Sequence, residues 1–419
     1  MFYQEKDENQ STKEKILLAT INASVKQVKN PYSLCNIAKD VGISKPAIFK
    51  YFRCKENLIN AAISKAFDDV SSIYIQIKNQ YQDDVEKIIQ YFTLWLLENP
   101  SYLSFILSNF ITKKNFSLMI VTEFASRGVK LKKDFLSKEG IEEIYVTSSI
   151  IALMSCFFKY LKNSDKEMSL NQFEEFAEKI SKCICYGITK DGSEFNINYE
   201  RLDQICENGK NQILEEKKKK SNKDENQTKN ETRFFNALAA VIKKHSFSGV
   251  TIENLAEEAG LAKSSLYTWY KNKDDLLKKV IFANFSELKD LLEYNFNLVE
   301  TPIEKSYVIL KTEMTWLLEH ISVLPVVAWL NFSENGTIDA EEIIFSDSIW
   351  ANNLFDVKNQ SKLISVWMTC LPVPIVLEGC CKDYSRDFLE NSVQKIHSMF
   401  WNGILHKNKE YKNEAKIKN

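Results

Sequence analysis

The chain has 419 residues, more than the roughly 250–300 at which a single hydrophobic core stops growing, so at least two compact domains are expected. It holds 11 glycines and 7 prolines. This is about 4% of the chain against roughly 12% in ordinary proteins, which disfavours sandwiches, barrels and glycine-rich nucleotide folds. The net charge of −1 excludes no partner, because charge can be sorted along a chain. An all-α fold is predicted.

Neither an export signal nor a membrane segment is predicted. The N-terminus lacks a basic start followed by an apolar stretch, and the longest apolar runs are shorter than the ~20 residues that span a bilayer. The nine cysteines are odd in number and scattered, which fits a reducing compartment better than a disulfide framework. We therefore expect a cytoplasmic protein without a membrane partner.

The sequence matches itself at an offset of 218 positions, which aligns residues 16–58 with residues 234–276 without a gap. Identical residues meet at 8 of these 43 positions, and apolar positions agree in kind, as Ile48 does with Leu266. Downstream, the Trp-Leu-Leu-Glu that begins at Trp95 recurs at an offset of 221. A tandem duplication of a unit of about 200 residues explains both matches.

Each copy predicts three short helices at its start. The residues expected to cap the first two helices are Ser11 and Ser33 in the first copy and Thr228 and Thr251 in the second. Gly42 and Gly260 follow where a tight turn needs a residue that tolerates positive φ. A third helix is predicted at 45–52 and again at 263–270, which completes a helix-turn-helix.

These residues resemble a known family. Residues 33–52, which read SLCNIAKDVGISKPAIFKYF, and the following Lys55-Glu56-x-Leu58 are similar to the DNA-binding head of TetR-type transcriptional regulators, and so are residues 251–276. The resemblance implies a head whose third helix enters a major groove, joined to a larger helical body that binds a ligand and dimerises.

The resemblance also implies which residues touch DNA. In the first head these are Ser33, Ser44, Lys45, Pro46, Ala47, Phe49, Lys50, Tyr51 and Lys55. In the second head they are Thr251, Lys263, Ser264, Ser265, Tyr267, Thr268, Trp269 and Lys273. Lysine can donate to guanine acceptors, and small apolar groups can touch thymine methyls. Lys55 and Lys273 are expected at phosphates, where they position the head without reading sequence.

Departures from the family pattern predict that the two heads differ. Phe49 lacks the hydroxyl of the tyrosine that is common in the family and that Tyr267 retains. Ala262 replaces Ser44, which is expected to cap the third helix, and Glu253 makes the second head more acidic. Acidic groups near phosphates weaken binding by repulsion, so the heads should not read identical half-sites.

Charge is sorted along the chain. Residues 1–65 contain 11 Lys or Arg against 6 Asp or Glu, and residues 217–285 contain 14 against 8. Basic heads on acidic bodies fit a protein that touches DNA with one end. A Lys-rich composition is the alternative reading of the same counts.

The predicted domains follow from the repeat. They are heads at 1–58 and 230–276, bodies at 59–211 and 277–408, a flexible charged linker at 212–229 and a polar tail at 409–419. By resemblance, 143–161 with 170–188 and 361–381 with 385–403 are candidates for a four-helix interface that pairs the halves as an intrachain pseudo-dimer. A homodimer stays open.

Other chemistry is not indicated. The resemblance implies a small apolar or aromatic effector, and its candidate pocket residues, which can equally be core, are Trp95, Trp316, Trp329 and Trp367. Cysteine and histidine spacings match no zinc site, and no phosphate loop or nucleophile elbow is present. No metal, cofactor or enzyme activity is expected, and a redox switch at Cys35 and Cys54 is a minor alternative.

The sequence therefore predicts a DNA-binding transcriptional regulator: a repressor that reads an asymmetric operator and is released by a small ligand. The alternative is a ligand sensor or protein-interaction module that no longer binds DNA. The effector, the operator and target genes, and repression against activation stay open at this stage.

Overall fold

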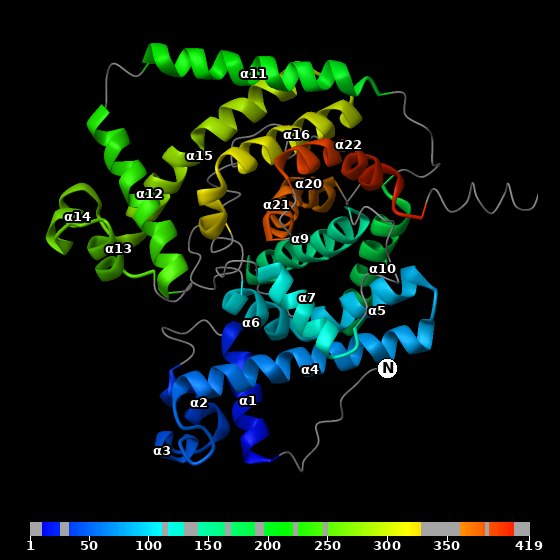
Figure 1. The fold of residues 1–419 in the computed structure, drawn as a ribbon, viewed down its shortest axis with the longest axis vertical. Coiled ribbons are helices and arrows are strands. Elements are labelled where there is room, and N and C mark those ends of the chain that lie inside the picture. Colours follow the sequence, from blue (N-terminus) through cyan, green and yellow to red (C-terminus); the bar gives the residue numbers. More distant parts are fainter. Residues whose placement is uncertain are drawn as a thin grey trace, which may run out of the picture. The chain divides into compact units, whose positions relative to one another are not determined.

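The described part of this computed structural model is built from helices, with no strand among the described residues (Figure 1), which confirms the all-α prediction. The structure describes residues 11–25, 33–110, 116–129, 141–163, 169–188, 197–220, 225–245, 250–327, 361–381 and 385–405. None of the described helices combines the length and the apolar character needed to cross a membrane.

The chain divides into two compact units. The first comprises residues 1–135, 168–181 and 332–335, and the second comprises residues 136–167, 182–331 and 336–419. Much of the region predicted as the first body, 59–211, therefore belongs to the second unit. The division follows packing and not the order of the repeat.

The first unit is organised around one long helix, α4. Its elements are α1 (Thr12–Asn22), η1 (Ala23–Val25), α2 (Leu34–Val41), α3 (Lys45–Ile48), α4 (Lys55–Tyr81), α5 (Val85–Glu98), α6 (Pro100–Phe110), α7 (Phe116–Ser126) and most of α10 (Leu170–Tyr186). The α4 helix packs against α1, α5, α6 and α7. Its Phe67 is fully buried and meets Phe110 and Phe124 edge to face, at centroid distances of 5.4 and 5.0 Å.

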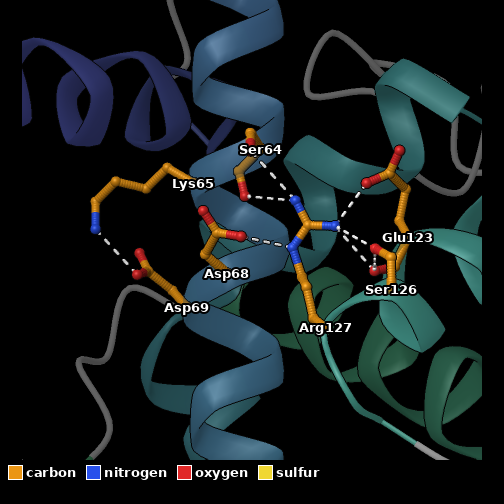
Figure 2. Close-up of polar contacts among 7 residues, drawn as sticks. All are labelled: Ser64, Lys65, Asp68, Asp69, Glu123, Ser126 and Arg127. Carbon is orange, nitrogen blue, oxygen red and sulfur yellow. Dashed lines mark hydrogen bonds and ion pairs between the residues drawn. The ribbon is translucent and has the colours of Figure 1, made fainter.

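Arg127, directly after α7, fastens that helix to α4 (Figure 2). Its guanidinium donates to the Asp68 carboxylate at 2.6 Å and to the Ser64 hydroxyl at 3.2 Å, both on α4. A third bond reaches the Glu123 carboxylate of α7 at 2.6 Å. Since α4 starts at the head and runs through the body, this cluster links the position of α7 to the helix that carries the head.

The second unit holds the second head and the remaining helices. These are α9 (Ile141–Asn163), the end of α10, α11 (Tyr199–Lys220), α12 (Glu225–His245), α13 (Ile252–Glu258), α14 (Lys263–Trp269), α15 (Lys273–Asn297), α16 (Pro302–Glu319), η3 (Ile321–Val323), α20 (Ser361–Cys370), α21 (Pro372–Cys381) and α22 (Arg386–Asn402). The α16 helix packs against α11, α15, α20, α21 and α22, so it forms the centre of this unit.

Helices from both halves of the sequence pack together inside the second unit. The α9 helix contacts α20, α21 and α22 (Figure 1). Glu142 of α9 forms an ion pair with Lys395 at 2.7 Å, and the Tyr145 ring lies 6.3 Å from that of Trp367. These are contacts between segments proposed from the sequence as a four-helix interface.

The ends of α10 and α22 contact each other reciprocally. The Ile188 N–H donates to the Trp401 carbonyl at 3.1 Å, and the Leu405 N–H donates to the Cys185 carbonyl at 2.9 Å. Gly187 and Gly403 both have φ of +75°, and a Cβ on either would lie within 2.3 Å of the carbonyl oxygen of Trp401 or Cys185. Each segment thus donates a backbone hydrogen bond to the other and places a glycine against a carbonyl of the other.

Three local expectations about helix boundaries are corrected. The segment expected as a flexible linker is helical on both sides of residues 221–224, which lie outside the described residues: α11 extends to Lys220 and α12 begins at Glu225. Thr228 therefore lies inside α12 and does not cap it. Glutamate, glutamine and lysine are good helix formers, so a charged segment extends a helix that is anchored elsewhere.

The segment 361–381 is two helices and not one. α20 ends at Cys370 and α21 begins at Pro372. Proline has no N–H and its ring crowds the preceding turn, so the helix ends there although the segment is largely apolar.

Candidate nucleic-acid interface

The first head is a three-helix unit with its own small core. Ile16 of α1, Ile37 of α2 and Ile48 of α3 are all at most 1% exposed, and Leu58 of α4 is fully buried as well. The spacing of these residues along the sequence predicts their burial, because each lies on the apolar stripe of its helix.

The turn between α2 and α3 has the geometry expected from sequence. The Ser33 hydroxyl accepts the N–H of Asn36 at 3.1 Å and caps α2. Gly42 has φ of +73°, and the Ile43 N–H donates to the Ala38 carbonyl at 2.9 Å. A Cβ at Gly42 would meet nothing within 4 Å, so backbone conformation alone requires glycine there.

The third helix of the first head presents its predicted reading residues to solvent. Ser44, Lys45, Pro46, Phe49, Lys50, Tyr51 and Lys55 are exposed, whereas Ser33 and Ala47 are half-buried. Phe49 and Tyr51 are 46% and 43% exposed. Two aromatic rings between two lysines provide a surface suited to bases and phosphates.

Two details of α3 differ from the sequence prediction. The regular helix ends at Ile48, and residues 49–52 continue as turns. The N–H groups of these residues, including that of Tyr51, donate to backbone carbonyls three or four residues earlier. The Ser44 side chain makes no capping hydrogen bond. Pro46, in the second helical position, has no N–H, and the N–H of Ala47 in the third position donates to the Ser44 backbone carbonyl at 2.9 Å and not to its side chain.

The second head repeats this frame. Phe234 of α12, Leu255 of α13 and Leu266 of α14 are at most 2% exposed. Thr251 accepts the N–H of Asn254 at 3.2 Å and caps α13, and Gly260 has φ of +62°. The predicted cap and the predicted positive φ are both confirmed.

The α14 helix carries a different reading surface on that frame. Lys263, Ser264, Tyr267, Thr268 and Trp269 are exposed, and Thr251, Ser265 and Lys273 are half-buried. Tyr267 is 51% and Trp269 45% exposed. Lys263 at the start of the helix forms an ion pair with Glu253 of α13, and this hydrogen bond raises the pKa of Lys263 above its usual value.

Lys55 and Lys273 occupy equivalent places. Each is the first residue of the long helix, α4 or α15, that follows the third helix of its head, called here the reading helix (α3 or α14). The N-caps before them are Cys54 in the first head and Asn272 in the second. The unpaired N–H groups at a helix N-terminus favour anions. A lysine at this position is therefore well placed for a phosphate, as the sequence predicts.

Two further basic residues escaped the sequence analysis. Arg53 and Lys271 lie in the turns between the reading helices and the long helices, and both are exposed. They correspond to each other at the offset of 218 positions, and that shared basic character was the available signal. Both are candidates for phosphate contacts beside Lys55 and Lys273.

The candidate pocket tryptophans are buried in packed cores. The Trp95 ring lies 5.1 Å from that of Tyr102, the Trp316 ring 5.3 Å from that of Phe285, and the Trp367 ring 4.7 Å from that of Phe400. These three tryptophans therefore contribute to the packing of the helical cores. Trp329 lies outside the described residues.

The cysteines considered above for metal binding or a redox switch are free thiols where the structure describes them. Cys35 and Cys54 are exposed, and burial raises the pKa of Cys183 to about 11. Within the described ranges, no three His, Cys, Asp or Glu side chains come together in a group that could hold a metal ion.

Comparisons with known proteins agree with the geometry of the second head. Residues 235–280 match the family model described as bacterial regulatory proteins, tetR family. A stretch of 142 residues is 24% identical to the uncharacterized HTH-type transcriptional regulator YxbF of Bacillus subtilis (strain 168). It covers 33% of this chain and 36% of that relative, so the chain matches about a third of the relative's length. Residues 235–280 are thus a helix-turn-helix domain of the tetR type, the class found in DNA-binding transcriptional regulators.

Proposed function

We propose that this protein is a DNA-binding transcriptional repressor whose two heads read an asymmetric operator and whose affinity for DNA is lowered by a small ligand. The observation that carries the proposal is the repeated head. A capped second helix, a glycine turn and an exposed third helix with basic and aromatic side chains occur twice, and one copy lies in the segment that matches the tetR family model.

The differences between the two reading surfaces support an asymmetric operator. At equivalent positions the first head presents Lys50 and the second presents Thr268, and Lys263 is paired with Glu253 whereas no ion pair is described for Lys45. A free lysine can donate to guanine, while threonine offers a hydroxyl and a methyl group. Two such surfaces select different bases.

The reciprocal contacts of the α10 and α22 ends support an intrachain pseudo-dimer. In a symmetric dimer, one patch on each subunit meets the same patch on the other. Within this single chain, Gly187 lies against the Trp401 carbonyl and Gly403 against the Cys185 carbonyl, which is a similar mutual contact. We call this contact the crossing. Fusion of the two halves allows each to diverge, which a homodimer does not.

A binding-site selection with the full chain and a random double-stranded library tests the proposal. The expected result is one enriched site with two half-sites of unlike sequence, about one helical turn apart. Lys45→Ala and Lys50→Ala should each relax the preference in one half-site only. A palindromic site, or equal loss in both half-sites, would contradict the asymmetric reading.

The Glu253–Lys263 ion pair also favours a second candidate function. It neutralises a lysine that the second head would use on DNA, as expected of a sensor or protein-interaction module that has lost DNA binding. In the selection experiment, absence of any enriched sequence supports this alternative against the repressor.

A further inference from the structure

Glu313 is a buried acid without a partner. It lies in the middle of α16, its residue is 3% exposed, and neither carboxylate oxygen has a hydrogen-bond partner. A carboxyl group in such surroundings loses its hydration without compensation. Burial, with a smaller effect of the nearby Cys370 thiol, raises the pKa of Glu313 well above its usual range.

The helix opposite Glu313 also carries an unsatisfied polar atom. Cys370 belongs to α20, which packs against α16, and Trp367 lies one turn earlier on the same helix. Trp316 lies one turn after Glu313 on α16. The indole N–H groups of both tryptophans are buried and have no acceptor. The contacting helices α16 and α20 therefore hold a buried acid and two buried indole N–H groups, all without a hydrogen-bond partner.

The first body shows that a helix of this kind does not need the acid. At the offset of 221 positions that aligns Trp95 with Trp316, Phe92 occupies the place of Glu313. Its ring packs edge to face on Tyr74, at a centroid distance of 5.5 Å. An aromatic ring fills this position in one body, so the carboxyl of the other body is not a requirement of the helix.

We infer that the second body binds a small organic cation, an amine with an aromatic or apolar part, through the carboxylate of Glu313. The inference deepens the proposed function and rests on it, because it names the chemical class of the releasing ligand and the body that takes it. An ammonium group supplies the donors that both carboxylate oxygens of Glu313 lack.

Other ligand classes fit this site less well. A purely apolar ligand leaves the two oxygens unsatisfied, and an anion gains no opposite charge from Glu313 in either protonation state. A metal ion needs more ligands than the described residues supply around Glu313. An organic cation satisfies the acid with one charged group and leaves its apolar part for the core.

Calorimetric titration of the full chain with phenethylamine tests the inference, with phenethyl alcohol as the uncharged probe of the same shape. Phenethylamine should bind at least ten times more tightly than the alcohol. Because a protonated Glu313 must ionise to pair with the ammonium group, binding near neutral pH should release a proton, seen as a dependence of the heat on the buffer. Equal affinity for the two probes, or no binding of either, would overturn the inference.

Two variants separate a ligand site from a structural role. Glu313→Phe installs the residue of the first body, and Glu313→Gln keeps the size while removing the charge. Both should lower phenethylamine affinity at least tenfold and abolish the proton release. The matched control is Glu319→Gln, at the end of the same helix, where the acid is already paired with Lys210 and Arg386. Unchanged binding in either Glu313 variant would overturn the inference.

The outcome can be separated from that of the proposed function. DNA binding is measured without an amine, and amine binding is measured without DNA. A selected operator together with failure of phenethylamine to bind would refute the cation site and leave the repressor. Amine binding that depends on Glu313, with no selected DNA, would support the site and refute the repressor.

Discussion

The two heads share one frame and carry different surfaces on it. Gly42 and Gly260 have the same left-handed backbone, and Ile48 and Leu266 fill the same place in the two cores at 1% exposure each. Lys50 and Thr268, which face solvent at equivalent positions, differ completely in chemistry. Core and turn positions are held by packing and backbone geometry, whereas surface positions change without cost to the fold. The differences between the heads therefore lie on their exposed surfaces and leave their shared structure intact.

The bodies differ at a position that is half-buried in the first body, at Phe92, and buried in the second, at Glu313. Phe92 has an aromatic partner in the first body, while Glu313 has no hydrogen-bond partner in the second. A buried polar group without a partner reduces stability, so the presence of Glu313 is more readily explained by function than by folding. The following predictions test where the two halves are equivalent and where they are not.

The largest effect is expected where the halves are equivalent. Gly187→Val and Gly403→Val each place a side chain onto a carbonyl at a positive φ, and each should lower the free energy of unfolding by about 3 kcal/mol. Gly42→Ala, where only the backbone is strained, should cost roughly 1–2 kcal/mol. Urea denaturation measures all three. A large cost at one crossing glycine and none at the other would contradict the two-fold relation.

The next effect separates the bodies. Because the pKa of Glu313 is raised in the folded protein, the folded state keeps a proton that the unfolded chain releases above about pH 4.5. Stability from this group is complete below that pH and falls by about 1.4 kcal/mol per pH unit as the pH rises towards the folded-state pKa. Urea denaturation at several pH values should show this slope in the wild type, and Glu313→Gln should lack it. Parallel slopes would contradict the assignment.

A smaller effect is expected from the phosphate contacts that both heads share. Lys55→Ala together with Lys273→Ala should weaken binding to all DNA sequences and reduce the slope of log affinity against log salt by about 2. Fluorescence anisotropy over a range of salt concentrations measures the slope. Each single variant should account for about half of the change. An unaltered slope would remove both lysines from the phosphate backbone.

The smallest effect distinguishes the two reading helices. Glu253→Gln frees Lys263 from its ion pair and should strengthen DNA binding by the second head by about fivefold at most, since exposed pairs are weak. Asp40→Asn, an exposed acid on the second helix of the first head, is the matched control and should have less effect in the same anisotropy measurement. Weaker binding of Glu253→Gln would show that Glu253 supports the head.

Most of the heads could be predicted from sequence because local rules determine them. Ser33 and Thr251 cap their helices, Gly42 and Gly260 have positive φ, and the apolar stripe identifies buried residues such as Ile37. Each of these features depends on residues within a few positions along the chain. The cap expected from Ser44 is absent for a reason that is also local: Pro46 has no N–H, and the Ala47 N–H donates to the Ser44 backbone carbonyl.

The functional site was predicted less completely. The reading residues follow from the resemblance, but Arg53 and Lys271 were missed because a basic residue in a turn has no periodicity that marks it. The sequence analysis named tryptophans as candidate pocket residues and did not name Glu313. An acid in an amphipathic helix looks like any solvent-facing acid until its neighbours are known.

What the sequence by itself determined is the helical class, the two heads and the residues on their exposed faces, because capping, glycine turns and apolar periodicity act over short distances. Tertiary structure alone decided that α9 packs with α20, α21 and α22 in the second unit, that Gly187 and Gly403 meet carbonyls across a reciprocal crossing, and that Glu313 is buried without a partner. Those features depend on which apolar faces meet, and that choice joins residues far apart in the chain.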